Sequence, residues 1–596
     1  MNRTLISETV SKVGETVLLQ GWVDTRRDHG KIVFIDLRDR TGKVQMVLMP
    51  GLAGDLKSED VISLTGLVKA RPEKLINPRL ATGTVEIEAQ KIEVLSRSEV
   101  LPFDMSGETL DVQLPTLLDH RSLTLRHPKV QAIFKVQAVI IDSFRRALQA
   151  KDFLEFQSPS IISSIPEGGS EVFEVKYFEN KAYLSQSPQL YKSLLVGDFE
   201  RVFSVNKVFR AEPSVTTRHL TEVVSLDAEF GFIESWLDVL AMEEYVVRFI
   251  FSEVEKKCSS ELAMFGATLP KLSGKIPLIK LREAQEIILK RTGRDVRHEK
   301  DLAPEDEREI CKWSLEEHGS DLVFVSHFLT KKKPFYVMPD PEDPEFALSV
   351  DLLGRGVEWS SGGQRLNDYE QIKKNVQEWG LKEEDVALFL QSFKYGVPPL
   401  GGFALGAERM TMHILGLQNI REASMFPRDM ERVDFRLGGQ QTESKGEKVY
   451  KQILEKLAGV EIKTLEHKET KTSADSAHVR GTTVEQGAKA LVAISDETPV
   501  LLVLSAAKKA DLDKAKIALR SENLHLASET EMKKITGLEI GAVPPFGSVL
   551  GLKTYVDNSL SENEEIAFNA GLRTKSIIMK FSDYRNIESP QVCDIS

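Results

Sequence analysis

The chain has 596 residues, of which 41% are hydrophobic and 28% are charged, and its formal net charge at pH 7 is −12. This length exceeds what one hydrophobic core can organise, so we expect three or four domains. No run of about 18 apolar residues occurs and the first residues lack the apolar stretch of a signal peptide, so no membrane association is expected. The negative charge disfavours DNA as a partner, although a local basic groove could still bind a phosphate backbone.

The cysteines also limit the class of protein. Cys258, Cys311 and Cys593 lie far apart in the sequence. This spacing argues against a disulfide framework or a cysteine zinc site and fits a reducing compartment. We therefore expect a cytoplasmic protein.

Short β-rich segments dominate residues 1–104, which we expect to form the first domain. The segments are 16–23, 31–39, 42–49, 61–70 and 84–95, separated by Gly, Asp and Lys turns. Five such strands predict a small Greek-key barrel of the OB type, a common binder of single-stranded nucleic acid. Other small barrels would fit the same spacing.

The next domain, residues 105–437, mixes helices and strands. An amphipathic helix carries Ile133, Val136, Ile140, Phe144 and Leu148 on one stripe, and further helices are predicted at 233–256 and 368–380. The irregular alternation with strands predicts an α+β domain around a largely antiparallel sheet. Neither a Rossmann nor a P-loop glycine motif occurs, which argues against those nucleotide sites.

A polar stretch, 438–447, is the predicted linker to a last domain, 448–596. That domain is predicted to be α/β, with helices at 448–457, 508–520 and 529–535 and strands in KALVAISD and PVLLVLS.

Clustered charges mark a first segment of the second domain, FRAEPSVTTRHLTE (209–222). It holds Arg210, Arg218 and His219 together with Glu212. Guanidinium groups match phosphate oxygens, so the loop could grip a triphosphate while the carboxylate accepts hydrogen bonds from an amine. A solvated loop with surface ion pairs is an equally good interpretation of this segment alone.

A second segment, DLLGRGVEWSSGGQR (351–365), places Asp351, Glu358 and Arg365 seven residues apart. We expect two strands with a turn at SSGG, because odd spacing otherwise puts such residues on alternate faces. Two carboxylates suit Mg²⁺, which takes one or two of them together with phosphate oxygens. An ordinary hairpin with charged edges is the alternative.

The third segment, GGFALGAERMTMHI (401–414), runs from small residues into a helix with Arg409 near its start. A helix N-terminus already favours anions, and this arginine adds a cation there. A glycine-rich turn with a surface arginine is the simpler interpretation of the segment by itself.

Together these segments resemble the signature motifs of class II aminoacyl-tRNA synthetases, in detail those of aspartyl-tRNA synthetases. FLEFQSPSI, with Pro159, resembles motif one, VFRAEPSVTTRHLTE motif two and GGFALGAERM motif three, and LSQSPQLYKSLL and NIREASMFPRD fit the same family. The resemblance covers residues 1–437, and the short spacing between motifs two and three is similar to the archaeal and eukaryotic type.

The resemblance implies an aspartate–tRNA ligase. L-aspartate would react with ATP, accompanied by Mg²⁺, and the aspartyl group would pass to tRNA-Asp. Catalysis would rest on positioning and charge neutralisation by Arg210, Arg409 and Glu358. The family also implies a homodimer formed through motif one.

Matched motif positions imply a role for individual residues around the nucleotide. The ATP-binding set is Arg210, Glu212, Arg218, His219, Asp351, Glu358 and Arg409, and the metal set is Asp351, Glu358 and Ser361. Val223 departs from the family, which usually has a phenylalanine there that stacks on adenine. We therefore expect weaker ATP binding.

For the amino acid, Arg365 and Lys192 are expected to pair with the side-chain carboxylate. The set around the α-amino group is Glu167, Gln189 and Asp227, and Arg210 also contacts aspartate. A neutral asparagine would leave Lys192 as a buried cation without a partner, so the pocket favours a carboxylate. An asparagine–tRNA ligase and a non-catalytic tRNA-binding paralogue remain as alternatives.

In the barrel, Arg27, Phe34 and Gln45 match the family positions that contact the anticodon. Val33 and Ile35 already provide a core face, which leaves Phe34 on the other face, although a core role for Phe34 is the alternative. His29 is found in relatives that charge both tRNA-Asp and tRNA-Asn, so tRNA-Asn stays open as a second substrate.

The last domain resembles the YbaK/prolyl-tRNA synthetase insertion-domain family of aminoacyl-tRNA deacylases through AKALVAISD, ITGLEIGAVPPFG and YVDNSL. The resemblance implies that Lys489 holds the tRNA 3′ end. It also implies that the loop from Gly541 to Gly547, with Pro544 and Pro545, lines an aminoacyl pocket. A domain that only binds tRNA is the alternative.

Overall fold

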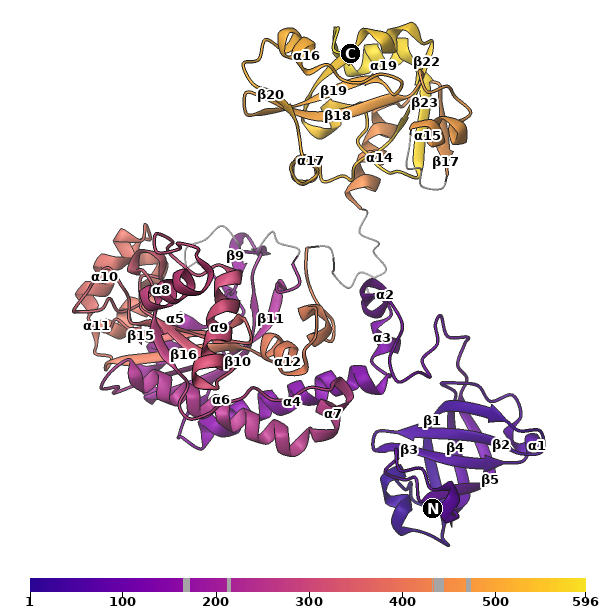
Figure 1. Ribbon diagram of the computed structural model, residues 1–596, viewed down its shortest axis with the longest axis vertical. Coiled ribbons are helices and arrows are strands. Elements are labelled where there is room, and N and C mark those ends of the chain that lie inside the picture. The colour runs from indigo at the N-terminus through magenta and orange to yellow at the C-terminus, as the bar shows by residue number, and fades with distance from the viewer. Residues whose placement is uncertain (164–171, 212–215, 431, 433–443, 468–472) are drawn as a thin grey trace. The chain divides into compact units, whose positions relative to one another are not determined.

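The computed structural model describes residues 1–163, 172–211, 216–430, 432, 444–467 and 473–596 (Figure 1). The chain divides into two compact units, Met1–Val433 and Asp434–Ser596. Both contain helices and sheets, and the predicted multidomain α+β class is confirmed. None of the described helices combines the length and the apolar composition needed to cross a membrane.

The N-terminal region is a closed five-stranded barrel with the strand order β1-β2-β3-β5-β4. The strands are β1 (Thr16–Asp28), β2 (Val33–Asp39), β3 (Gly42–Leu48), β4 (Val61–Ala70) and β5 (Val85–Ser96). Side chains alternate across each strand as the pleat requires. In β2, Val33 and Ile35 are buried while Phe34 is half-buried. The predicted OB-type barrel is confirmed, and Phe34 does not belong to its core.

An eight-stranded sheet forms the second region, with the order β12-β13-β14-β15-β16-β11-β10-β6. Neighbours are antiparallel except near the two edges, where β12 pairs with β13 and β6 with β10 in parallel. The strands are β6 (Leu154–Glu155), β10 (Arg201–Phe209), β11 (Glu222–Gly231), β12 (Leu278–Lys280), β13 (Leu322–Ser326), β14 (Ser349–Gly354), β15 (Val357–Arg365) and β16 (Leu400–Gly406). A small separate sheet contains β7 (Ile161–Ile162), β9 (Asn180–Leu184) and β8 (Glu174–Tyr177).

Helices surround this sheet. They are α2 (Leu114–Asp119), α3 (Arg121–Thr124), α4 (Pro128–Gln149), α5 (Gln189–Phe199), α6 (Leu237–Lys257), α7 (Ser259–Phe265), α8 (Leu281–Thr292), α9 (Pro304–His318), α10 (Tyr369–Glu378), α11 (Ala387–Lys394) and α12 (Ala407–Leu415). The alternate residues Leu226, Ala228 and Phe230 of β11 join the buried cluster formed by α4, α6 and α12. Asp227 and Glu229 therefore point to the opposite face, which carries α5.

The hairpin β14–β15 turns earlier than the sequence suggested. Arg355 and Gly356 have positive φ values of 49° and 86° and form the turn, and two such residues in succession are typical of a tight hairpin turn. The SSGG stretch lies inside β15, where Gly363 pairs with Ser349 and Gly362 with Val350. The turn predicted at SSGG is therefore wrong.

The C-terminal unit combines two sheets. One has the order β20-β18-β19-β21-β24 and the other the order β17-β23-β22. The strands are β17 (Ile462–Glu466), β18 (Ala488–Ser495), β19 (Thr498–Ser505), β20 (Leu524–Leu526), β21 (Lys553–Asp557), β22 (Glu565–Asn569), β23 (Lys575–Lys580) and β24 (Gln591–Cys593). The helices are α14 (Lys445–Lys456), α15 (Ser473–Arg480), α16 (Leu512–Leu519), α17 (Glu529–Thr536), α18 (Gly547–Leu550) and α19 (Phe581–Glu588). A single buried cluster contains residues of both sheets and of α14, and α14 begins within the stretch 438–447 that was predicted as a linker.

Candidate active site

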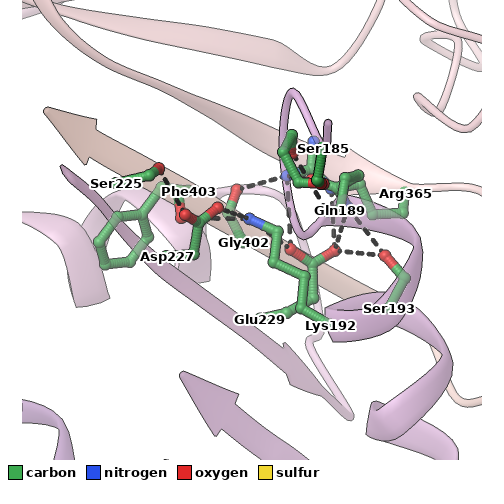
Figure 2. Close-up of polar contacts among 11 residues, drawn as sticks. Ser185, Gln189, Lys192, Ser193, Ser225, Asp227, Glu229, Arg365, Gly402 and Phe403 are labelled. Carbon is green, nitrogen blue, oxygen red and sulfur yellow. Dashed lines mark hydrogen bonds and ion pairs between the residues drawn. The ribbon is translucent and has the colours of Figure 1, made fainter. Parts of the chain in front are cut away.

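Two buried carboxylates of β11 hold a buried lysine of α5 (Figure 2). Lys192 Nζ lies 3.0 Å from Asp227 Oδ1 and 3.3 Å from Glu229 Oε2, and none of the three side chains is more than 1% exposed. Lys192 Nζ also donates to Phe403 O at 3.3 Å. Because β11 alternates, both carboxylates reach the face that α5 covers.

A buried arginine of β15 completes the cluster. Arg365 Nε donates to Glu229 Oε1 at 2.9 Å, and Nη2 donates to Gly402 O at 3.0 Å and to Gln189 Oε1 at 3.4 Å. Gln189 Nε2 donates in turn to Glu229 Oε1 at 3.2 Å. Burial by itself would raise the pKa of Glu229, but Arg365 and Lys192 outweigh burial and lower that pKa. The structure thus brings together Gln189, Lys192, Asp227 and Arg365 as predicted.

The charges within this cluster are balanced, which corrects one inference from the sequence. Lys192 was expected to lack a partner unless the ligand supplied a carboxylate. Asp227 and Glu229 already provide two negative charges against the two positive charges of Lys192 and Arg365. The cost of an unpaired lysine therefore does not by itself separate aspartate from asparagine.

Glu229 is the residue of this site that sequence reasoning missed. A strand pattern could have found it, because SLDAEFG alternates Asp227 and Glu229 with apolar residues. Gly402 of β16 provides the space for the Glu229 carboxylate. A Cβ at position 402 would overlap Glu229 Oε2 and Ala228 O.

Charged side chains also converge around Glu358 of β15. Arg409 Nη1 of α12 donates to Glu358 O at 2.7 Å and lies 3.7 Å from Glu358 Oε1. Desolvation raises the pKa of Glu358 and the Asp351 carboxylate adds to the rise, while Arg409, Lys333 and Arg210 oppose it. The predicted nucleotide residues Arg210, Asp351 and Arg409 thus all act electrostatically on Glu358.

A further carboxylate of α9 borders this group. Arg218 Nη1 lies 3.7 Å from Glu307 Oε2. Burial raises the pKa of Glu307 to about 7, with a further contribution from Glu358, while Arg218 and Arg409 lower it. The sequence offered no signal for Glu307, because it is one of several acidic residues in the first turn of α9.

The carboxylates Asp351 and Glu358 fit a hard cation. Asp351 Oδ1 is buried without a hydrogen-bond partner among the described atoms, and the Glu358 side chain keeps 40% of its accessible surface. Ser361 pairs with Asp351 across the hairpin but is exposed. No cluster of three or more His, Cys, Asp or Glu side chains suited to a metal occurs in the described part of the chain. A site with only two carboxylates matches Mg²⁺ that is shared with phosphate oxygens.

Residues 419–429 form hydrogen bonds to the segment that was predicted as motif two. Arg421 Nη1 donates to Thr216 O at 2.9 Å, and Thr221 N–H donates to Arg428 O at 2.9 Å. His219 Nδ1 and Thr216 Oγ1 are 2.6 Å apart.

The predicted residues Glu167 and Glu212 lie outside the described residues.

In the barrel, Arg27 and Phe34 face each other across β1 and β2. Arg27 Nη2 lies 3.0 Å from Asp36 Oδ1, and Gln45 Nε2 donates to Glu86 Oε2 at 3.3 Å. The ring of His29 lies edge-on to Phe34 with 5.5 Å between centroids. These residues occupy one outer surface of adjacent strands.

The C-terminal unit contains a pocket of about 600 Å³. Of the five residues predicted for editing, Lys489 and Gly541 line it. Pro544, Pro545 and Gly547 are buried and do not belong to its described lining. Tyr584 Oη donates to Pro545 O at 2.8 Å, which fixes this part of the loop in the core.

Comparison with known proteins matches each part of the chain to a family. Residues 113–430 match the class II tRNA synthetases for D, K and N, residues 17–95 the OB-fold nucleic acid binding domain, and residues 467–587 the aminoacyl-tRNA editing domain. An aspartate–tRNA(Asp/Asn) ligase of Deinococcus radiodurans is 40% identical over 439 residues, which is 73% of this chain and 99% of that protein. An aspartate–tRNA(Asp) ligase of Pyrococcus abyssi is 38% identical over 445 residues, which is 73% of this chain and 100% of that protein.

Solved structures show the same relationship. The asparaginyl-tRNA synthetase of Pyrococcus horikoshii has a TM-score of 0.67 at 32% identity, covering 73% of this chain and 99% of that one. The aspartyl-tRNA synthetase of Entamoeba histolytica has a TM-score of 0.65 at 29% identity, covering 73% and 93%. The chain therefore belongs to the aspartyl-tRNA synthetase family of class II aminoacyl-tRNA synthetases, and it carries an N-terminal OB-fold domain and a C-terminal aminoacyl-tRNA editing domain.

Proposed function

We propose that this chain is an aspartate–tRNA ligase that activates L-aspartate with Mg²⁺-ATP and charges both tRNA-Asp and tRNA-Asn. The observation that carries the proposal is the buried cluster of Lys192, Arg365, Asp227 and Glu229, which lies on the same sheet as the carboxylates of β14 and β15. Aspartate carries an ammonium group and a side-chain carboxylate, and this cluster offers partners of both signs. The identity of 40% to an aspartate–tRNA(Asp/Asn) ligase over nearly its whole length supports the same amino acid.

In the proposed reaction, Lys192 and Arg365 hold the side-chain carboxylate and Asp227 holds the ammonium group. An α-carboxylate oxygen of aspartate attacks the α-phosphorus of ATP, and the bond to pyrophosphate breaks. Arg210 would neutralise the α-phosphate, and Arg218, His219 and Arg409 would neutralise the other phosphates. When bound, Mg²⁺ would be held by Asp351 and Glu358, with Ser361 nearby, and would supply charge neutralisation to the phosphates. The 3′-terminal hydroxyl of the tRNA then attacks the activated carbonyl and AMP leaves.

ATP–pyrophosphate exchange tests which amino acid the ligase activates. We expect exchange with aspartate and little with asparagine. Exchange with asparagine alone would establish an asparagine ligase, and no exchange with either would indicate a tRNA-binding paralogue. Aminoacylation of purified tRNA-Asp and tRNA-Asn with aspartate, measured side by side, tests the tRNA specificity, and size-exclusion chromatography with light scattering tests the homodimer that the family implies.

The match of residues 467–587 to an editing domain favours a second activity. We propose that the C-terminal unit hydrolyses mischarged aminoacyl-tRNA: water adds to the ester carbonyl, the bond to the ribose oxygen breaks, and the free amino acid and tRNA are released. Lys489, which lines the pocket, would hold the tRNA 3′ end. The test is deacylation by the full chain without ATP, AMP or pyrophosphate. Slower hydrolysis by Lys489→Ala would support the activity, and no hydrolysis of any mischarged tRNA by the wild type would reject it.

A further inference from the structure

A buried arginine lies in the wall of the C-terminal pocket. Arg480, the last residue of α15, is 8% exposed and lines the pocket of about 600 Å³. Its Nε donates to Ser576 Oγ at 2.9 Å, Nη2 to Asn569 Oδ1 at 2.6 Å and Nη1 to Ala567 O at 3.4 Å. All three acceptors are neutral, so the hydrogen bonds do not balance the charge.

Within the described part of the chain, no carboxylate forms an ion pair with Arg480. Burial lowers the pKa of Arg480 to about 10, so the guanidinium stays protonated at neutral pH. A buried charge without a counter-charge is unfavourable. A buried arginine can also have a structural role: Arg121, which Glu422 influences electrostatically, donates to the carbonyl oxygens of residues 422, 424 and 425 and so holds that segment in place. Arg480 differs because it borders a pocket that can hold a ligand.

The remaining charges of the pocket point to the same kind of ligand. Its described lining contains Lys489 and Arg573 in addition to Arg480, against the single carboxylate of Glu529, which is exposed. Lys489 Nζ donates to Lys508 O at 2.6 Å and Arg573 Nε to Ile540 O at 2.6 Å. Lys489 thus binds a neutral carbonyl oxygen, whereas Arg573 Nε also lies 3.9 Å from Glu539 Oε2, so the positive charge that an anion would meet in the described lining comes from Arg480 and Lys489.

We infer that this pocket binds the side-chain carboxylate of an acidic aminoacyl group, aspartyl or glutamyl, on Arg480. The inference rests on the proposed deacylase activity and names its substrate class. A deacylase that discriminates between amino acids must bind their side chains differently. A neutral asparaginyl or glutaminyl group would leave the buried guanidinium without a counter-charge, and sites built around buried polar groups reject ligands that leave them unpaired.

The contacts of Arg480 favour the amino acid over a tRNA phosphate as the source of the anion. Asn569, which accepts from Arg480, donates through Nδ2 to Gly541 O at 2.6 Å. Arg480 is thereby linked to the loop that the family resemblance assigns to the aminoacyl group. Lys489 is less buried than Arg480 and suits the phosphates of the terminal nucleotides better. Because the ligase itself makes an aspartyl ester, a glutamyl ester is the mischarged product that this preference would remove.

Binding of non-hydrolysable analogues to the full chain tests the inference without requiring hydrolysis. The probes are 3′-deoxyadenosines that carry an aspartyl, glutamyl, asparaginyl or glutaminyl group in a 3′-amide bond, each with and without a 5′-phosphate. A sulfamoyl analogue of aspartyl-adenylate is added first so that the ligase site is occupied. We expect at least one acidic probe to bind at least about tenfold more tightly than its amide counterpart, the effect of a charge-assisted hydrogen bond. Arg480→Met should abolish this difference, whereas Arg585→Met, at an exposed arginine of α19, should leave it unchanged.

Equal binding of acidic and neutral probes to the wild type would overturn the inference, and this comparison needs no folded variant. An effect of Arg480→Met only on probes with a 5′-phosphate would assign the arginine to the tRNA backbone and overturn it as well. An equal loss of binding for all probes in Arg480→Met would show that Arg480 has a structural role, and this result would also overturn the inference. If acidic probes bind preferentially but the full chain hydrolyses no aminoacyl-tRNA, the ligand class stands and the proposed deacylase activity fails.

Discussion

Glu229 and Arg365 form a buried ion pair in the candidate active site: Arg365 Nε lies 2.9 Å from Glu229 Oε1, and the side chains of Arg365 and Glu229 are 6% and 0% exposed. The pair joins β11 to β15, the strand that carries Glu358. In the proposed reaction, the charge that holds the amino acid and the charge that serves the nucleotide would therefore lie on the same strand, β15. Rigid placement of this kind is what a reaction based on positioning and neutralisation needs.

Glu229→Gln removes the central negative charge while keeping the shape. We expect a loss of about 3–5 kcal/mol in the free energy of unfolding, because Arg365 and Lys192 then share only Asp227 as a buried counter-charge. Aspartate-dependent exchange should fall with it. Glu316→Gln breaks an exposed ion pair of similar length with Arg291 and should change stability by less than about 1 kcal/mol. Equal effects in thermal unfolding would contradict the central role of Glu229.

Gly402→Ala places a methyl group where the Glu229 carboxylate lies. We expect a destabilisation of about 1–3 kcal/mol from overpacking, together with a raised KM for aspartate because the cluster must shift. Gly51→Ala is the control, since nothing lies within 4 Å of a Cβ there. An unchanged KM in Gly402→Ala would show that the close approach has no role in binding.

Glu408 predicts a pH dependence of stability. It is buried and accepts a hydrogen bond from Val224 N–H at 3.0 Å, and burial raises its pKa from the usual range of a glutamate to about 7. The folded state therefore holds a proton that the unfolded state loses, so the contribution to stability is complete below the unfolded pKa and disappears as pH rises through 7. In Glu408→Gln, the melting temperature should fall less between pH 5 and pH 7.5 than in the wild type. Identical slopes would refute this assignment.

Val223 occupies the position where the family usually places an aromatic residue against adenine. It is half-buried and packs against the core of the sheet. Val223→Phe should lower the KM for ATP several-fold in the exchange reaction and leave the KM for aspartate unchanged, because the gain is stacking on the base alone. A higher KM for ATP would mean that the present pocket has no room for the ring.

Phe34 lies half-buried on the outer face of β2, beside His29. Phe34→Ala should raise the KM for tRNA by the equivalent of about 1–3 kcal/mol of lost stacking, while exchange without tRNA stays unchanged. Ile32→Ala, a neighbouring residue that is 39% exposed, is the matched control. A defect in exchange would point to a structural role instead.

The spacing of hydrophobic residues in the sequence predicted the helices and strands that follow a regular period. The barrel strands and helices α4 and α6 are visible as alternating or helical stripes. The start of α16 was placed four residues early, because Asp511, whose side chain caps the helix through the N–H groups of Asp513 and Lys514, marks its real beginning. The turn of β14–β15 was misplaced because Gly362 and Gly363 look like turn residues, whereas the sheet uses them where a Cβ would overlap neighbouring backbone.

The site residues that belong to a sequence motif were predicted. The site residues that come from distant segments without a motif were missed. Gln189, Lys192, Asp227 and Arg365 were predicted from the family pattern and do meet. Glu307 comes from an acidic helix start and Arg480 from the end of a short helix, and neither segment signals its partners. Such contacts depend on tertiary packing between segments far apart in the chain, which a period or a motif does not encode.

A crystal structure with a sulfamoyl analogue of aspartyl-adenylate tests the central claim most directly. We expect the side-chain carboxylate of the ligand within about 3 Å of nitrogen atoms of both Lys192 and Arg365, with the adenosine beside Arg409. Lys192 and Arg365 still bound only to Asp227 and Glu229, with the ligand carboxylate held elsewhere, would contradict the account.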